Sequence, residues 1–321
     1  MRIHNRLWLL ALSTACAPGS VPAQTPSPAP HPAPVELRLA DGDLRVVNLY
    51  RIQTEVLRAG RGEPADTLVN RLVHRLYAPY TEFWNGYLGE EADFREWAVK
   101  LLDPAHPIHT RLAPLDAVRL DRRFTEGVDW IVRTTGHRPA GTWYIVFGPG
   151  WTDMGGLGGI GMVADFTRLT PDSAALANLL PHELTHQVQS ALERGDPDVG
   201  TVLHRIVGEG FASYVAWVYA GGKRTPAEAL MYREQEWTWA LAHERELLAA
   251  VRPILASRER KDSDRVASRS DHLIEGAPGA GGYFLGFRLV QAYLEKRGKD
   301  AWREIYDLPV AEVVRRSGYL D

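Results

Sequence analysis

The sequence contains almost no cysteine: Cys16 is the only one in 321 residues. A single thiol cannot form a disulfide within the chain, so the fold must be stabilised without cross-links. We place Cys16 in a leader that is removed from the mature protein. The mature chain then has no thiol at all, which excludes a cysteine nucleophile.

The sequence also lacks an excess of charge and any long apolar run beyond its N-terminus. Its 37 basic and 40 acidic residues give a net charge of −3 with histidine neutral. We therefore expect neither nucleic acid nor an anionic membrane as a partner. No later apolar run approaches the roughly 20 residues that cross a bilayer, so no transmembrane span is expected in the mature chain. The oligomeric state is left open.

The N-terminus has the pattern of a targeting segment. Arg2 and Arg6 give a positive start, and Leu7–Leu12 is a short apolar stretch. Small residues at the −3 and −1 positions predict signal-peptide cleavage after Ala23, and hence a secreted or periplasmic protein. A cytoplasmic disordered tail is the alternative. Lipid anchoring at Cys16 is a further variant, disfavoured because no aliphatic residue stands three positions before it.

We divide the chain into four parts. Residues 1–23 are the signal peptide, and the Pro/Ala-rich residues 24–34 form an extended tether. Residues 35–140 are predicted to be mainly helical, and residues 141–321 form the catalytic region. Within residues 35–140, apolar positions at helical spacing follow Asp66, and further helices are predicted over 91–102 and 122–133.

The catalytic region begins with strands and continues with helices. Thr142–Phe147 (TWYIVF) is β-branched and aromatic, and Met162–Leu169 partly alternates, so both are predicted strands. Helices are predicted up to about Arg194 and over 201–220, 226–248, 283–297 and 301 to the end, with 258–282 as a surface loop. The fold class that follows is α+β, mostly helical, with a small sheet.

The segment His182-Glu183-Leu184-Thr185-His186 carries the chemistry. Residues four apart lie on one face of a helix, so His182 and His186 can present two imidazoles to one cation. Two neutral nitrogens suit Zn²⁺. Glu183, rotated by about 100° from His182, lies beside the metal, where it can move a proton from water to a leaving amine. An amphipathic helix with two exposed histidines is the alternative.

Pro181 directly precedes the first histidine, and a proline deep in a helix removes a hydrogen bond. Two explanations remain open. The helix begins near Asn178, which leaves Pro181 in the first turn, or a kinked helix runs from Ser173. Either leaves His182 and His186 on regular helix.

A catalytic zinc site needs a third protein ligand and an open fourth position. Glu209 is our candidate because Gly208 and Gly210 flank it and allow a close helix approach, at a cost of about 1 kcal/mol per glycine. A surface position for Glu209 is the alternative. The weaker rival ligands are Glu193 and Glu244, and His204, at the wrong rotation to share a metal with Glu209, is assigned to packing.

Three segments together carry a family resemblance: HELTHQ, GEGFASY and Gly282–Val290 (GYFLGFRLV). The first motif followed by Glu209 resembles the gluzincin group of metallopeptidases. The three segments are similar to a bacterial family of predicted zinc-dependent proteases, over roughly residues 140–320. The resemblance implies a zincin-like fold, in which a small sheet borders the cleft and precedes an active-site helix and a glutamate helix. It implies one Zn²⁺ per chain on His182, His186 and Glu209, with Glu183 catalytic.

Two further positions are weighed against the gluzincin pattern. Ser213, four residues after Glu209, can accept an imidazole N–H, although many gluzincins place an aspartate there. Gluzincins also use a tyrosine or histidine that donates to the oxyanion. Tyr283 is our candidate, with Tyr214 and His272 as alternatives. A packing role fits Tyr283 equally well.

The Gly-rich stretch Gly148–Gly161 contains Gly156-x-Gly158-x-x-Gly161, which formally matches a dinucleotide motif. We expect no nucleotide here because a strand, not a helix, follows Gly161. Aminopeptidase gluzincins carry a glutamate in a Gly-rich motif upstream of the metal helix. This stretch has none, which favours endopeptidase over exopeptidase action.

The sequence therefore predicts a zinc-dependent peptidase with a peptide or protein substrate. Two other functions are kept open. In one, zinc stabilises a non-catalytic envelope or binding protein, and a fourth protein ligand closes the site. In the other, the enzyme hydrolyses a bond other than a peptide bond.

Overall fold

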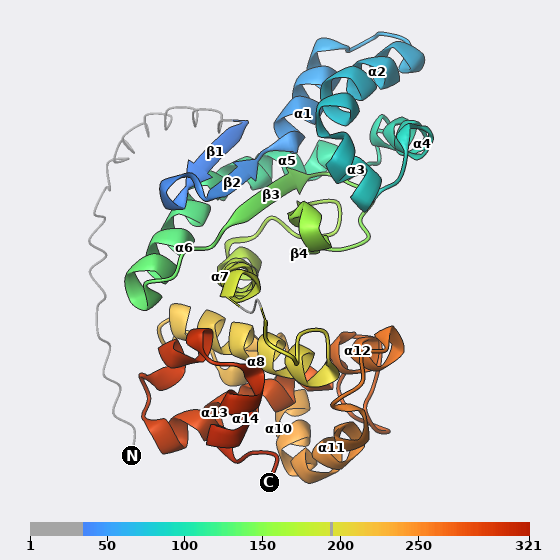
Figure 1. Cartoon of the computed structure of the whole chain (residues 1–321). Helices are drawn as coiled ribbons and strands as arrows, with labels where there is room; N and C mark the ends of the chain where they lie inside the picture. Colours follow the sequence, from blue (N-terminus) through green and yellow to red (C-terminus); the bar gives the residue numbers. More distant parts are fainter. Residues whose placement is uncertain (1–34, 193–194) are drawn as a thin grey trace, which may run out of the picture. The chain divides into compact units, whose positions relative to one another are not determined.

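Figure 1 shows a computed structural model of the protein, in which residues 35–192 and 195–321 are described. The predicted signal peptide, the tether and Glu193 lie outside the described residues. The described part belongs to one compact unit, Pro32–Asp321. Every helix in it is too short or too polar to span a bilayer.

Five short strands form a mixed sheet in the order β1-β2-β3-β5-β4. The strands are β1 (Glu36–Leu39), β2 (Leu44–Val47), β3 (Gly141–Val146), β4 (Met154–Gly156) and β5 (Met162–Asp165). β2, β3 and β5 run parallel, while β1 and β4 pair antiparallel at the two edges. The central strands are buried on both faces, as parallel strands usually are: Trp143, Ile145 and Val163 are fully buried.

The strands confirm part of the sequence prediction and correct another part. β3 and β5 coincide with the two predicted strands, although β5 ends at Asp165 rather than Leu169. β1 and β2 were not predicted, because residues from Val35 on were expected to be mainly helical. Both are only four residues long, and β2 finds its parallel partner in β3, almost a hundred residues later. The α+β class, mostly helical with a small sheet, is confirmed.

Helices make up most of the rest. Before β3 they are α1 (Leu49–Ala59), α2 (Ala65–Leu72), α3 (Thr81–Tyr87), α4 (Glu91–Leu101), α5 (Ile108–Ala117) and α6 (Leu120–Thr135). After β5 they are α7 (Ser173–Leu192), α8 (Val202–Tyr219), α9 (Pro226–Ala229), α10 (Glu234–Ala242), α11 (Glu244–Val251), α12 (Arg260–Ala267), α13 (Gly281–Arg297) and α14 (Val310–Ser317).

Two predictions for the chain after α8 were wrong. The segment 226–248 is not one helix, because capping boxes at Thr225 and Arg233 start separate helices and Met231 between them has a positive φ of 54°. The expected surface loop 258–282 contains α12. In the first segment, local capping divides what was predicted as one helix, and in the second a helix forms in a segment whose charged and Gly-rich composition predicted a loop.

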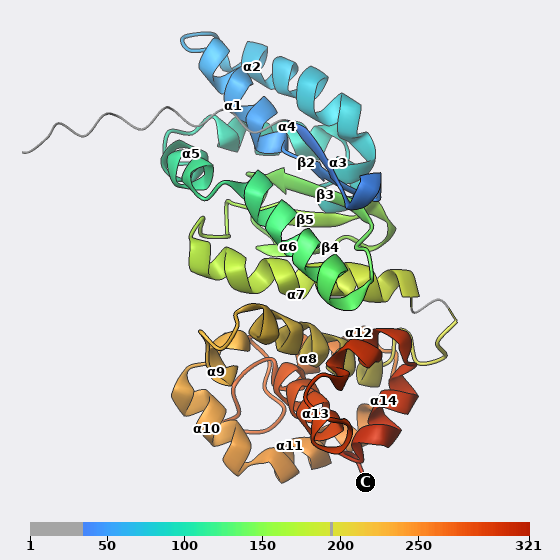
Figure 2. The same cartoon turned by 90° about the vertical axis from the view of Figure 1, so that its left-hand side faces the viewer.

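Helix α7 lies between the sheet and α8, as Figure 2 shows from the side. Gln187 ties it to the sheet: its side-chain amide donates to the Ala140 carbonyl at 3.1 Å, and its Oε1 accepts from the Trp143 indole at 2.6 Å. α7 begins at Ser173, so the shorter helix starting near Asn178 is wrong and Pro181 lies inside the helix. The helix that carries the HELTH motif is thereby held against the sheet.

Helix α8 crosses α13 at very close range. A Cβ added at Gly210 would lie 2.0 Å from the Gly286 carbonyl carbon, and one at Gly286 would lie 1.9 Å from the Ile206 carbonyl oxygen. The predicted close approach is therefore confirmed for Gly210, with α13 as its partner. At Gly208 the nearest atom, on Gln189, is 4.0 Å away, so this glycine is not required by packing.

Candidate functional site

Helices α7 and α8 bring three predicted ligands to one point. The Nε2 atoms of His182 and His186 are 3.1 Å apart, and Glu209 Oε2 lies 3.1 Å from the first and 3.2 Å from the second. His182 and Glu209 are buried, and His186 is half-buried. Among the described residues, these three form the group of His, Cys, Asp or Glu side chains able to hold a metal ion.

The geometry of this group fits zinc. Ligand atoms at 2.0–2.1 Å from a tetrahedral zinc lie about 3.3 Å from one another, close to the three distances observed. Three contacts join the two Nε2 atoms and Glu209 Oε2, and each of them needs a proton to be a hydrogen bond. A neutral imidazole has only one N–H, so the two histidines can supply at most two of the three protons. A cation between them removes this conflict, and two imidazoles with one carboxylate are a donor set that zinc accepts.

Charge inside the group follows from burial and from the carboxylate. Burial lowers the pKa of His182. Burial also opposes charge on His186, but the carboxylate of Glu209 outweighs it and raises the pKa of His186. Burial opposes charge on Glu209 as well, yet His186, His182 and Arg205 hold the pKa of Glu209 well below its usual range. Glu209 is therefore an anion aimed at two imidazoles.

Arg205 is a site residue that the sequence reasoning missed. One turn before Glu209 on α8, its Nη2 lies 2.9 Å from Glu209 Oε1, the oxygen that does not face the histidines. The guanidinium thus holds one carboxylate oxygen and leaves Oε2 for a cation. The i,i+4 spacing was the available signal, but it has meaning only once the direction of the Glu209 side chain is known.

Glu183 lies beside the group and not in it. Its side chain is half-buried, and burial raises the pKa of its carboxyl to about 8, with the charges of Glu209 and Asp153 adding to the shift. A cation held by the neighbouring ligands opposes this shift, because a nearby positive charge favours the carboxylate. The carboxyl of Glu183 is thus coupled electrostatically to His186 and Glu209.

Tyr283, at the start of α13, stacks on a ligand. Its ring is parallel to that of His182, with centroids 5.9 Å apart and an interplanar angle of 6°. Burial and the negative charge of Glu209 raise its pKa well above the usual value. The hydroxyl therefore stays protonated and can donate a hydrogen bond. The structure thus brings Tyr283 to the site, against the ring of His182.

The alternative residues have other surroundings. Tyr214 is buried against Trp217 and Phe287, and His272 is exposed. Glu244 accepts from Tyr319 and pairs with Arg288, so it is not a zinc ligand here.

Ser213 is placed as expected from its spacing. Its Oγ lies 3.4 Å from His182 Nδ1, on the side of the ring away from Glu209. A contact at this nitrogen favours the tautomer whose Nε2 lone pair faces a metal. His204, half-buried on the same helix, is outside the group of ligands.

The Gly-rich stretch forms the edge of the sheet next to α7. β4 runs along β5, and β5 follows directly after Gly161, so the strand predicted at this point is confirmed. The buried carboxylate of Asp165 fixes the start of this stretch by accepting from the backbone N–H groups of Gly148 and Gly150. The stretch also contains Trp151, which is 63% exposed.

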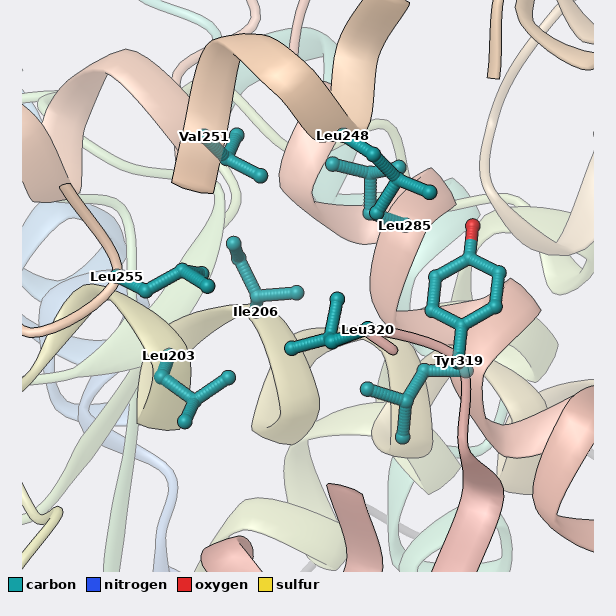
Figure 3. Close-up of a pocket in the computed structure, with 9 residues that line it drawn as sticks. Leu203, Ile206, Leu248, Val251, Leu255, Leu285, Tyr319 and Leu320 are labelled. Carbon is teal, nitrogen blue, oxygen red and sulfur yellow. The ribbon is translucent and has the colours of Figure 1, made fainter. Parts of the chain in front are cut away.

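A separate apolar cavity lies among α8, α11 and α13, as Figure 3 shows. Leu203, Val251 and Leu285 line it, and Tyr319 and Leu320 close it from the C-terminus. Its volume of about 10 Å³ is close to the least that one water molecule needs. With an apolar lining, this cavity offers nothing to a metal or a peptide.

Comparisons with known proteins agree with this geometry at the level of the family. A family described as "Predicted Zn-dependent protease (DUF2268)" matches residues 152–315, just over half of the chain. The matched segment includes the whole of α7, α8 and α13, and with them all five predicted site residues. Neither the curated proteins nor the solved structures gave a match. The chain belongs to this family of predicted Zn-dependent proteases.

Proposed function

We propose that this protein is a zinc-dependent peptidase in which His182, His186 and Glu209 hold the metal and Glu183 is the general base. The convergence of the three ligand atoms within 3.2 Å of one another carries the proposal. A structural zinc site is usually closed by four protein ligands, whereas a catalytic one has three. The group found among the described residues has three, which supports catalysis.

Bound zinc supplies a Lewis acid that polarises the scissile carbonyl and activates water. The protein groups then have separate tasks. Glu183 takes a proton from the attacking water on its carboxylate and delivers it to the leaving nitrogen. The Tyr283 hydroxyl, kept protonated by burial, donates to the oxygen that becomes negative in the transition state. Arg205 and Ser213 hold Glu209 and His182 in place.

The sheet supports an endopeptidase of zincin-like fold. β4 is an edge strand that packs against α7. In the chain, β4 and β5 are the last two strands before α7. An extended peptide can add to such an edge by main-chain hydrogen bonds. Gly148–Gly161 contains no glutamate that would hold a free amino terminus. We propose action in the periplasm or outside the cell on the strength of the predicted signal peptide alone.

The test is a comparison of Glu183→Gln with the wild type. We expect about one zinc per chain in both proteins by elemental analysis. Hydrolysis of labelled casein should fall by roughly 10²–10⁴-fold in the variant, the range for loss of a general base. Glu295→Gln, an exposed residue on α13, is the control and should keep full activity. Wild-type turnover in the Glu183→Gln protein would overturn the assigned role.

A further inference from the structure

A second arginine near the metal group is held between two tyrosine rings. The guanidinium carbon of Arg269 lies 5.1 Å from the ring centroid of Tyr283 and 5.6 Å from that of Tyr232. Tyr283 in turn stacks on the ring of His182. The guanidinium of Arg269 thus contacts Tyr283, and Tyr283 covers the proposed metal ligand His182.

The position of Arg269 is fixed by the backbone on either side. The Ala280 N–H donates to the Ser268 carbonyl at 2.7 Å, and Gly279 passes so close that an added Cβ would lie 2.0 Å from the Arg269 carbonyl oxygen. The Tyr232 hydroxyl donates to the Gly279 and Ala280 carbonyls at 2.9 and 3.1 Å. The platform under the guanidinium is therefore preorganised, which lowers the cost of binding a ligand.

The positively charged side chain of Arg269 is at the surface of the protein. Across residues 35–192 and 195–321, Arg269 takes part in no ion pair, and its side chain is exposed. Hydrogen bonds from Arg233 lower the pKa of Glu236, and the charge of Arg269 adds to this shift. The carboxylate of Glu236 is bound by Arg233 at 2.7 Å. A guanidinium presents a planar fork of donors that matches a carboxylate. Arg269 thus offers an exposed guanidinium beside the site.

The distance from the metal group sets which part of a substrate can reach this charge. The two ring contacts place the guanidinium carbon within about 11 Å of the His182 ring centre, and an extended chain covers roughly 3.3–3.6 Å per residue. We propose that Arg269 forms an anion subsite that binds a substrate carboxylate two or three residues from the scissile bond. This inference rests on the proposed peptidase function and adds a substrate class to it: peptides with an acidic group near the cleavage point.

The carboxylate can come from an Asp or Glu side chain or from the C-terminus of the peptide, and the experiment separates the two. The protein is the zinc-loaded full chain carrying Glu183→Gln, so that bound peptides are not consumed. The probes are nine-residue peptides, acetylated and amidated, with one Asp or Asn moved through each position. A further set keeps Asn and has a free C-terminal carboxylate. Calorimetry gives each dissociation constant.

We expect at least one Asp position, or the free carboxylate, to bind roughly tenfold more tightly than its neutral counterpart, the scale of one charge-assisted hydrogen bond. Arg269→Gln should remove this preference, and Arg269→Glu should transfer it to peptides that carry Lys. Arg260→Gln is the control, because Arg260 is also exposed, with 94% of its side chain accessible. It should keep the preference.

The outcomes separate this inference from the function on which it rests. Equal affinities for acidic and neutral peptides, or a preference that survives Arg269→Gln, would overturn the anion subsite and leave the peptidase intact. Failure of every peptide to bind the zinc-loaded protein would overturn it as well. A wild-type protein that takes up no zinc would overturn the proposed function, and the subsite with it.

Discussion

Two buried carboxylates in this molecule, Asp165 and Glu209, differ in what surrounds them. Asp165 is fully buried and Glu209 is 4% exposed. The oxygens of Asp165 accept from the backbone N–H groups of Gly148, Gly150 and Thr167 and from the Tyr87 hydroxyl, all at 2.8–2.9 Å. Four donors satisfy this carboxylate completely.

Around Glu209 the donors are incomplete. Arg205 satisfies Oε1, but Oε2 faces the two ring nitrogens of His182 and His186, which also face each other. A buried carboxylate with a full set of donors is a structural anchor, because it needs nothing further. A buried carboxylate that shares its free oxygen with two imidazoles needs a cation. The comparison therefore separates a structural carboxylate from one that we propose to bind a metal, without reference to any relative.

The largest expected effect is the loss of zinc affinity when the negative charge of Glu209 is removed, compared with the same change at Asp165. Glu209→Gln should weaken zinc binding by more than roughly 100-fold. Substitution of residues that only support a metal ligand already lowers metal affinity by about 10–100-fold. Asp165→Asn, the same chemical change at the satisfied carboxylate, should leave zinc affinity within a few-fold of the wild type. Competition with a chromophoric chelator measures both. Tight zinc binding by the Glu209→Gln protein would abolish the distinction drawn between the two acids.

The same contrast explains what the sequence could predict. His182, Glu183 and His186 lie within one helical turn or so, and their relation follows from helix geometry alone. The relative positions of these three side chains could therefore be predicted from the sequence, without knowledge of the fold. Glu209 could be proposed because of the two glycines beside it, of which Gly210 proves to meet α13 at close range.

The remaining features depend on contacts between distant segments. The Asp165 anchor needs Tyr87, which is 78 residues away in sequence, and β2 needs β3. Arg205 is close to Glu209 in sequence, but its role depends on which carboxylate oxygen turns to the histidines. Arg269 reaches Tyr283 only because its loop returns against Gly279. Periodicity carries no information on any of these pairings.

The second prediction concerns the cost of disturbing the structural acid. Asp165→Asn turns an N–H group towards backbone N–H groups that previously had an acceptor, and leaves part of this buried set unsatisfied. The free energy of unfolding should fall by about 2–3 kcal/mol, measured by urea denaturation of the zinc-free protein. Asp271→Asn, at an exposed position, should change it by less than about 0.5 kcal/mol. A loss below 1 kcal/mol at Asp165 would mean that this carboxylate is not the anchor described.

The smallest expected effect tests Arg205, the donor that holds Glu209 Oε1. Arg205 acts on a bound cation in two opposite ways: its charge repels the metal, while its hydrogen bond aims Glu209 Oε2 at it. Half of the Arg205 side chain is exposed, so solvent and salt screen the repulsion, and the aiming effect should dominate. Arg205→Met should therefore weaken zinc binding by roughly tenfold, and Arg205→Lys should weaken it less.

The sign of the change decides between the two effects. Arg315→Met removes an exposed arginine that is ion-paired with Glu312, and it should leave zinc affinity unaltered. If Arg205→Met binds zinc more tightly than the wild type, the guanidinium acts chiefly as a repelling charge. Glu209 would then be held by the histidines and the metal alone, and its surroundings would be even less complete than those of Asp165.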